Sequence, residues 1–179
     1  PVEDFERVMA TNCTGVFRGM QAFAQAAAQT QPKDPSLLLI KSIYGSGGSA
    51  FSNAGYQASK FCVDGLTKQG AIEFVRPDPV RGTPAISVNS LSPGFVKTPM
   101  TRGWWGAHPQ VNDTIASNHP SGAWVAPVQI GKTATQLLAP APFTGNDVFV
   151  DNGVSAESIP QVDDAENLRA ITDQPCCGK

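Results

Sequence analysis

Apolar residues near the start of the chain recur at the spacing of an amphipathic helix. Because residues three and four apart lie on one face of a helix, the pattern predicts a long helix with one buried face. The polar segment 31–35 contains two prolines and is expected to end this helix. The buried face comprises Phe5, Val8, Met9, Cys13, Val16, Met20, Phe23 and Ala27.

Three short runs predict strands at 37–40, 86–90 and 147–150. The first run is apolar on both faces, as in the buried strands of a parallel sheet. Helices are predicted between and after the first two runs, at about 56–75 and at 128–138. Strands that alternate with helices predict an α/β fold with a parallel sheet and helices on both faces.

The chain has 179 residues, which is enough for one domain with a core. We expect this domain at 1–158, followed by a polar C-terminal tail at 159–179. The net charge of −2 provides no electrostatic attraction for nucleic acid or for an anionic membrane surface. No apolar run approaches the roughly 20 residues that span a bilayer.

The four cysteines do not form the pattern of a disulfide framework. Cys13 and Cys62 fall within helical patterns and are predicted to be small buried apolar residues. Cys176 and Cys177 are adjacent, which suits neither a bond between them nor a metal site. Acidic residues also stand where a signal peptide would need an apolar stretch, so we expect a reducing, cytoplasmic location.

The motif that carries chemistry is Tyr56-x-x-x-Lys60, in the second predicted helix. Residues four apart lie on the same helix face. A tyrosine hydroxyl ordinarily titrates near pH ~10, and a neighbouring ammonium favours its ionised form. The pair is therefore suited to move a proton to or from a carbonyl or alcohol oxygen. Taken alone, the motif equally fits a surface tyrosine and lysine on an ordinary helix.

A glycine-rich segment at 45–50, Gly-Ser-Gly-Gly-Ser-Ala, matches the dinucleotide fingerprint G-x-G-x-x-A. That fingerprint requires a helix to begin directly after it. Ser52, Asn53 and Gly55 separate the segment from the predicted helix. We therefore favour an active-site loop over a phosphate-binding turn.

Three further segments accompany the Tyr56–Lys60 pair. Residues 5–12 are Phe-Glu-Arg-Val-Met-Ala-Thr-Asn, and 89–100 are Asn-Ser-Leu-Ser-Pro-Gly-Phe-Val-Lys-Thr-Pro-Met. Residues 144–153 are Thr-Gly-Asn-Asp-Val-Phe-Val-Asp-Asn-Gly. In this order and at this approximate spacing they resemble the short-chain dehydrogenase/reductase family. The resemblance implies part of a doubly wound, Rossmann-like parallel sheet in which the last three strands are present.

The resemblance also implies roles for four catalytic residues. Tyr56 would be the acid/base, and Lys60 would lower its pKa and hold the nicotinamide ribose. Ser42 would hydrogen-bond the substrate oxygen, with Ser46 as the alternative because the interval from Ser42 to Tyr56 is one residue longer than usual. Asn12 would kink its helix and hold a water of the proton relay.

The cofactor implied is NADP or NAD. Pro93 and Gly94 would shape the loop beside the nicotinamide, and Val96 and Thr98 would contact its carboxamide. The sequence contains no Thr-Gly-x-x-x-Gly-x-Gly turn for the pyrophosphate and no residue that selects between the two cofactors.

In the resembling family, the segment after the Pro-Gly turn closes over the substrate, which here corresponds to 100–127. Its three tryptophans indicate a bulky or apolar substrate, although the same rings would equally pack the segment on the domain. The two histidines lack cysteine or carboxylate partners, so no metal site is predicted. The residues concerned are Trp104, Trp105, His108, His119 and Trp124.

The resemblance implies an NAD(P)-dependent oxidoreductase that interconverts a carbonyl and a secondary alcohol by hydride transfer. The alternative is a non-redox scaffold of the same fold, such as a cyclase, an isomerase or a binding module. We expect a small-molecule substrate and a homodimer or homotetramer formed through the first two long helices. The first strand would have an open edge, so the chain alone is expected to be marginally stable, aggregation-prone or dependent on a partner.

Overall fold

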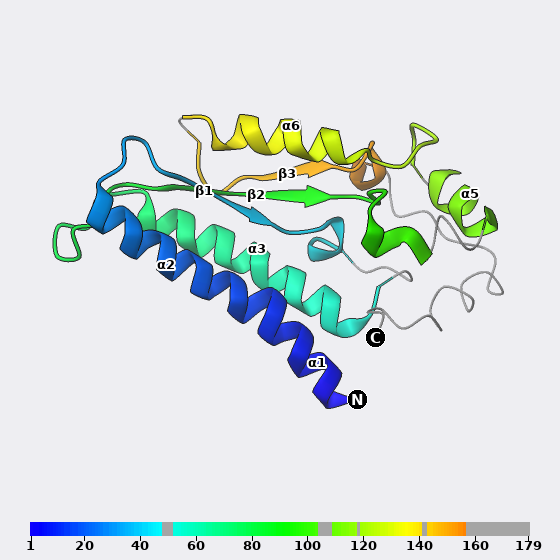
Figure 1. Cartoon of the computed structure of the whole chain (residues 1–179), viewed down its shortest axis with the longest axis horizontal. Coiled ribbons are helices and arrows are strands. Elements are labelled where there is room, and N and C mark those ends of the chain that lie inside the picture. The colour runs from blue at the N-terminus through cyan, green and yellow to red at the C-terminus, as the bar shows by residue number, and fades with distance from the viewer. Residues whose placement is uncertain (48–51, 104–108, 118, 141–142, 157–179) are drawn as a thin grey trace.

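The computed structural model describes residues 1–47, 52–103, 109–117, 119–140 and 143–156. Its centre is a parallel sheet of three strands in the order β1-β2-β3. The strands are β1 (Ser36–Ile40), β2 (Ser87–Pro93) and β3 (Asp147–Val150). Helices α2 and α3 lie on one face of the sheet and α6 lies on the other (Figure 1). The α/β fold with helices on both faces is thus confirmed.

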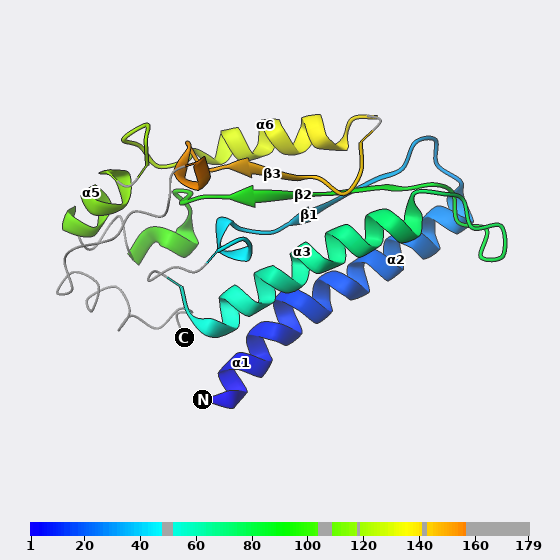
Figure 2. The same ribbon diagram turned by 180° about the vertical axis from the view of Figure 1, so that it is seen from behind.

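The long helix predicted at the start of the chain is present, but it is interrupted. It consists of α1 (Val2–Met9), a π-helical turn at Ala10–Thr14 and α2 (Gly15–Thr30). It ends at Gln31, whose backbone is left-handed with φ 46°. Seen from behind, α1 continues beyond the sheet while α2 runs alongside α3 (Figure 2).

The helix that carries the Tyr-Lys motif is α3 (Ala54–Phe74). Asn53 caps it, because its side-chain oxygen accepts a hydrogen bond from the backbone N–H of Tyr56 at 2.8 Å. Two further helices are α5 (Pro109–Ser117) and α6 (Pro127–Leu138). Short 3-10 turns occupy Ile43–Gly45, Pro99–Thr101 and Val154–Ala156.

Two predicted elements differ from the structure. The second strand was expected to stop at 90 before the Pro-Gly break, but β2 runs from Ser87 through Pro93 and pairs with Val150 there. Proline is tolerated at this strand end because the next residue, Gly94, supplies the N–H that bonds Val150 O at 3.0 Å. Helix α5 was not predicted, since its short apolar pattern is embedded in a segment rich in Pro, Gly and Trp.

The prediction for two cysteines was wrong. Cys13 and Cys62 are half-buried rather than core residues, and they form a disulfide with a Cα–Cα distance of 5.7 Å. The bond joins the π-helical turn to α3. Sequence spacing could not reveal it, because the two residues are 49 positions apart and meet only when α1–α2 packs beside α3. Cys176 and Cys177 lie outside the described residues.

The apolar core lies between the sheet and the α2–α3 pair. Leu39, Val88 and Val63 come from β1, β2 and α3, and each is almost fully buried. Met20 closes this core from α2. Gly70 on α3 makes room for it, because a Cβ at Gly70 would lie 2.6 Å from the Met20 Cε. The core therefore fixes α3 on the sheet and sets the position of Tyr56 near its first turn.

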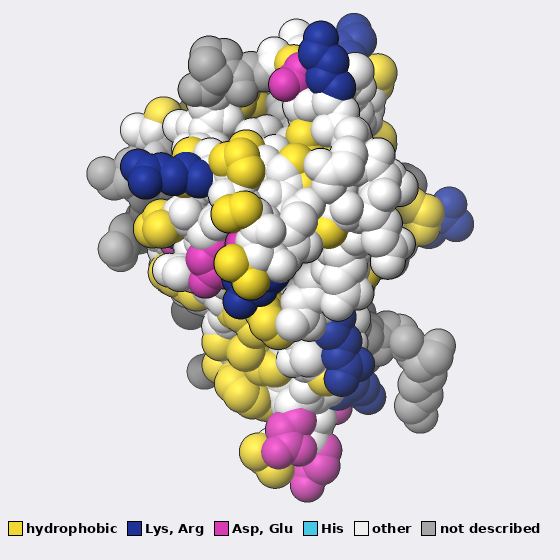
Figure 3. Space-filling model, turned by 90° about the vertical axis from the view of Figure 1, so that its left-hand side faces the viewer, with side chains coloured by type: hydrophobic (Ala, Val, Ile, Leu, Met, Phe, Trp, Pro, Cys, Tyr) yellow, Lys and Arg dark blue, Asp and Glu magenta, His cyan; other side chains and the backbone are white. Residues whose placement is uncertain are grey.

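The surface at the amino ends of the strands, opposite the end near Tyr56, contains a cavity. An open cavity of about 440 Å³ lies at the amino ends of the strands, between the start of β2 and Phe143. Viewed from this end, the molecule shows hydrophobic side chains in several groups and small separate groups of Lys/Arg and Asp/Glu (Figure 3). The cavity is remote from the Tyr-Lys motif, because its lining includes Val75, just after the end of α3, whereas Tyr56 and Lys60 lie near the start of that helix. No helix among the described residues has the length and apolarity to cross a membrane.

The edge of β1 provides the first prediction. Within the described part of the chain β1 pairs with β2 alone, so its outer edge presents unpaired backbone groups. We expect the 179-residue chain to associate through this edge, and Ile40→Lys at this strand to reduce the association. Sedimentation velocity over a range of protein concentrations measures it.

The matched control is Ile72→Lys on α3, because Ile72 is also exposed (69%, against 48% for Ile40) but lies away from the edge. A concentration-independent monomer before any substitution would contradict the prediction.

Candidate active site

The predicted site residues are distributed over the carboxyl ends of β1 and β2, the π-helical turn and the first half of α3. Parallel strands place their carboxyl ends at one edge of the sheet, where the following turns meet. Ser42 follows β1, and Pro93 ends β2. Tyr56 and Lys60 lie on α3, whose first half faces the turn after β1.

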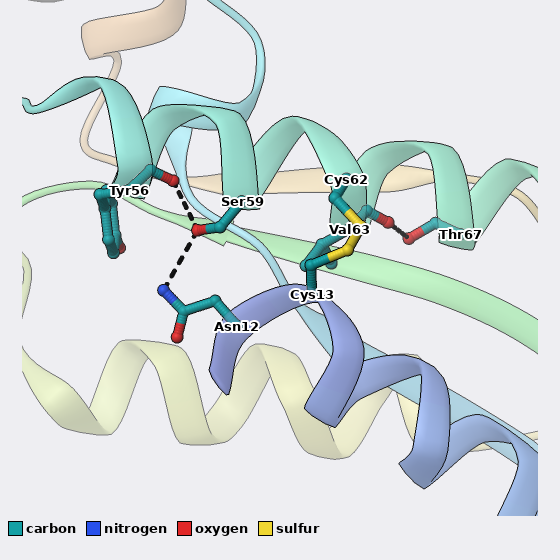
Figure 4. Close-up of a disulfide and its surroundings, with 7 residues drawn as sticks. All are labelled: Asn12, Cys13, Tyr56, Ser59, Cys62, Val63 and Thr67. Carbon is teal, nitrogen blue, oxygen red and sulfur yellow. Dashed lines mark hydrogen bonds between the residues drawn. A yellow bond between two sulfur atoms is a disulfide. The ribbon is translucent and has the colours of Figure 1, made fainter. Parts of the chain in front are cut away.

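Asn12 is connected to Tyr56 through Ser59. The Asn12 Nδ2 donates to Ser59 Oγ at 3.1 Å, and Ser59 Oγ donates to the backbone carbonyl of Tyr56 at 2.6 Å (Figure 4). Ser59 is completely buried. Asn12 lies within the π-helical turn, and such turns often occur at functional sites. The helix kink and the water implied for Asn12 stay predictions.

Tyr56 and Lys60 lie one helical turn apart on α3. The Lys60 Nζ lies 5.5 Å from the centroid of the Tyr56 ring and donates to the carbonyl of Ile40 at 3.1 Å. Burial lowers the pKa of Lys60, because it disfavours the charged ammonium. The arrangement brings a cation beside a phenol at the end of β1.

Ser42 and its alternative, Ser46, have different surroundings. Ser42 is buried, its Oγ accepts from the backbone N–H of Tyr44 at 3.3 Å, and its carbonyl accepts from Ser92 Oγ at 3.3 Å. Ser46 is exposed, and its hydroxyl accepts from Lys41 Nζ at 2.7 Å. Ser42 therefore lies in the interior at the strand end, while Ser46 belongs to a neighbouring polar network.

Gly45 holds the turn of Ser42 close to α3. A Cβ at Gly45 would lie 2.6 Å from the Lys60 carbonyl oxygen and 2.6 Å from the Lys41 Cε. Any side chain there would push the turn away from α3. The close approach of the turn thus requires glycine.

Lys41, which precedes Ser42, is the centre of the polar network. It is 3% exposed, and its Nζ donates to Asp64 Oδ1 at 2.9 Å and to Asp147 Oδ2 at 2.7 Å. Asp147 in turn accepts from the hydroxyls of Ser90 and Ser92 at 2.8–2.9 Å. One buried ammonium thereby links β1, α3 and β3 directly below the site.

Sequence reasoning did not identify this network. The carboxylate partners of Lys41 are 23 and 106 residues away from it along the chain. The only signal was local: a charged residue directly after an apolar strand must be neutralised if the strand end is buried. Which carboxylates neutralise it depends on the tertiary fold.

The loop predicted to contact the nicotinamide is held by backbone contacts. Gly94 lies against Asp151, since a Cβ at Gly94 would be 2.8 Å from the Asp151 Cα. Val96 forms a parallel bridge with Val125. The N–H of Thr98 donates to Thr101 Oγ1 at 3.0 Å, and that hydroxyl donates to the carbonyl of Val96 at 2.7 Å.

Aromatic rings extend from Tyr56 toward α5. The rings of Tyr44 and Tyr56 meet edge to face with centroids 6.4 Å apart, and Tyr44 meets Phe95 at 6.0 Å. Phe95 contacts Trp124 at 6.0 Å and His119 at 5.5 Å. The ring of Trp124 thus packs its part of the 100–127 segment on the domain. Such packing was one of the two expectations for the aromatic rings of this segment. Trp104, Trp105 and His108 lie outside the described residues.

Within the described residues, no group of three or more His, Cys, Asp or Glu side chains is placed to hold a metal ion. His119 is buried and its Nδ1 lies 2.8 Å from the carbonyl of Ile115, so this ring is part of the packing beneath α5.

Known proteins match this chain over nearly the whole range that the structure describes. A family model described as enoyl-(acyl carrier protein) reductase matches residues 1–155. The chain is 40% identical over 155 residues to a 3-alpha-(or 20-beta)-hydroxysteroid dehydrogenase of Mycobacterium tuberculosis; the match covers 86% of this chain and 53% of the relative. The chain thus spans about half the length of that relative.

Solved structures also resemble this chain. One protein, provisionally assigned as a 2-deoxy-d-gluconate 3-dehydrogenase from Agrobacterium tumefaciens and solved with bound NADP, is 28% identical with a TM-score of 0.76. A 4-hydroxyisoleucine dehydrogenase in complex with NADH is 27% identical, also with a TM-score of 0.76. Each covers 88% of this chain, and the matches span 61% and 62% of those chains respectively.

The Lys41 network provides the second prediction. Replacing Lys41 by Met leaves two carboxylates without their shared buried cation, so we expect a loss of about 3–5 kcal/mol of stability. Urea unfolding followed by circular dichroism measures the loss. Lys68→Met is the matched control, because Lys68 is an exposed second partner of Asp64 and its removal should change stability little. Equal effects of the two substitutions would contradict a structural role for the buried ammonium.

Asp64 provides the third prediction, on acid stability. Burial raises the pKa of Asp64, but hydrogen bonds from Lys68 and Lys41 lower it by more, so the net pKa is below its ordinary value of 3.8. A depressed folded-state pKa stabilises the protein above the unfolded-state pKa, and this contribution is lost as pH falls through the folded-state value. We therefore expect Asp64→Asn to lose less stability than the unmodified chain when the pH is lowered from 6 to about 3. Thermal melts across this range test it, and equal acid sensitivity of the two proteins would contradict it.

Proposed function

The chain belongs to the short-chain dehydrogenase/reductase family, and we propose that it forms the catalytic part of an enzyme that interconverts a carbonyl and a secondary alcohol with a nicotinamide dinucleotide. The observation that carries the proposal is the Tyr56–Lys60 pair. Its ammonium lies 5.5 Å from the phenol ring and is anchored to the carbonyl of Ile40, at the strand end where Ser42 follows.

The residues at this edge fit a nicotinamide cofactor. An ammonium has three N–H donors, and Lys60 uses one of them on Ile40. The others suit the vicinal hydroxyls of a ribose. The loop after β2 is braced by Asp151 and Val125, which supports the proposal that Val96 and Thr98 contact the carboxamide. Solved structures similar to this chain hold NADP in one case and NADH in another, and we propose one of these two cofactors.

In the proposed reaction the bound nicotinamide supplies or accepts the hydride. The hydroxyl of Tyr56 donates a proton to the substrate oxygen during reduction, and the Tyr56 phenolate receives the proton of the alcohol during oxidation. Lys60 favours the ionised phenol and so adjusts its acidity for this exchange. Ser42 donates a hydrogen bond to the same oxygen. Asn12, held on Ser59, would keep a water in place for proton return to solvent.

We propose an apolar, ring-containing substrate. Tyr44 is half-buried and meets the Tyr56 ring edge to face, so its ring would contact such a substrate, whereas Phe95 and Trp124 are buried behind it. The similarity to a hydroxysteroid dehydrogenase supports the same choice.

Three other expectations stay predictions: a homodimer or homotetramer through the first two long helices, a catalytic region at 1–158 and a cytoplasmic location. Phe17 on α2 and Phe61 on α3 are each nearly half exposed, which supports an interface there.

Replacing Tyr56 by Phe tests the function. In the active enzyme we expect kcat to fall by about 10²–10⁴-fold, because the positioned proton donor is lost, while cofactor binding persists. Turnover is followed by nicotinamide absorbance, and binding is followed by nicotinamide fluorescence. Tyr44→Phe is the matched control, because it removes the hydroxyl of the chain's other tyrosine and should retain turnover.

Substantial turnover by Tyr56→Phe would place the proton donor elsewhere. Absence of nicotinamide binding by the unmodified enzyme would favour the non-redox scaffold.

A further inference from the structure

The disulfide between Cys13 and Cys62 lies within the framework of the candidate site. Cys13 directly follows Asn12 in the π-helical turn, and Cys62 lies two residues after Lys60 on α3. The close-up shows the bond joining the same two helices that the Asn12–Ser59 hydrogen bond joins, about one turn further along α3 (Figure 4). A covalent link and a polar link therefore act in parallel between these helices.

Helix α1 and the π-helical turn also pack along α3. Ser59 receives the Asn12 amide at 3.1 Å, and Gly55 approaches α1 closely enough that a Cβ there would contact the Phe5 Cα at 3.5 Å. Phe5 itself is 42% exposed, and α1 has no buried residue. The links at Asn12 and Cys13 therefore add to this packing and hold the Asn12-bearing turn on α3 at defined points.

We propose that Cys13 and Cys62 form a reversible redox link that controls how firmly the Asn12-bearing turn is fixed on the helix of Tyr56 and Lys60. With the bond formed, the turn is clamped and the Asn12 amide stays on Ser59. With the bond reduced, the turn and α1 move more freely relative to α3. The active-site consequence rests on the function proposed above, but the link itself does not.

The chemistry is thiol–disulfide exchange with a small dithiol or a protein dithiol. One thiolate of the dithiol attacks one sulfur of the bond, forming a mixed disulfide and releasing the other cysteine as thiolate. The second thiol of the reductant then closes on the first, releasing the remaining cysteine. Two electrons reduce the protein bond, two protons end on Cys13 and Cys62, and the dithiol becomes a disulfide. The reverse exchange with a small-molecule disulfide restores the link.

Both sulfurs belong to half-buried residues, and the neighbouring Thr14 and Phe61 are exposed. A reagent in solvent therefore has access to the bond in the folded single chain, before the proposed association through these helices covers Phe61. In the reducing cytoplasm expected from the sequence, the pair would rest as thiols and form the link under oxidation.

The test begins from a Cys176→Ser/Cys177→Ser background, in which Cys13 and Cys62 are the only cysteines. The protein is equilibrated with oxidised glutathione or with dithiothreitol and then alkylated. Intact mass spectrometry counts the free thiols, and non-reducing electrophoresis separates intrachain from interchain bonds. We expect no free thiol and a monomeric chain mass after oxidation, and two free thiols after reduction.

Thermal melts and hydrogen exchange measure the physical effect. Reduction is expected to lower the Tm by on the order of 5–10 °C. It should also increase amide exchange at 2–14 and 54–62 more than in the strands. The matched control is the additional Cys13→Ala/Cys62→Ala variant, which should resemble the reduced protein and not respond to either reagent.

Three results would overturn the link: two free thiols after oxidation, a bond between two chains, or reduction that changes neither Tm nor local exchange. In the active enzyme we further expect reduction to lower kcat by about twofold or more, because Asn12 is positioned less firmly. The alanine variant should show no redox response. An enzyme that is inactive in both redox states would contradict the proposed function, whereas mass, melting and exchange decide the link independently.

Discussion

The buried ammonium of Lys41 joins three elements that the rest of the structure depends on. It draws Asp64 of α3 and Asp147 of β3 to the end of β1, so the turn that carries Ser42 has a fixed relation to the helix that carries Tyr56. A buried charge is costly unless its partners are close and correctly oriented. The network therefore specifies one arrangement of strand, turn and helix, and it does so beside the candidate site.

The interior of the molecule changes character along the strands. The face beneath α3 is apolar at Leu39 of β1 and Val88 of β2, which pack with Val63. Further along the chain this face is polar, with Lys41 just after β1 and Ser92 near the end of β2, and both donate hydrogen bonds to Asp147, the first residue of β3. The apolar part supplies general stability, whereas the polar part supplies orientation. The Tyr56–Lys60 pair lies at the polar end, where groups that exchange protons can be positioned accurately.

The sequence predicted elements with strong local periodicity and missed features that depend on distant contacts. The first helix, α3, α6 and all three strands follow from apolar spacing, and the Tyr56–Lys60 pair follows from its separation of four residues. Helix α5 was missed because its pattern is short and lies among breakers. The Cys13–Cys62 bond and the partners of Lys41 were missed because nothing in a local window indicates which distant residues approach one another. The roles given to Asn12, Ser42 and the loop of Val96 and Thr98 stay predictions.

The π-helical turn at Ala10–Thr14 makes the packing of α1 sensitive to the number of residues in this segment. Such a turn holds one residue more than an α-helical turn, and each residue of a helix rotates the following one by about 100°. Deleting a single residue between Ala10 and Thr14 would restore a regular helix but rotate all of α1 about its axis. Phe5 would then leave its contact with Gly55, and Asn12 or Cys13 would lose its facing partner on α3. This segment should therefore tolerate substitution at its exposed positions far better than any change in length.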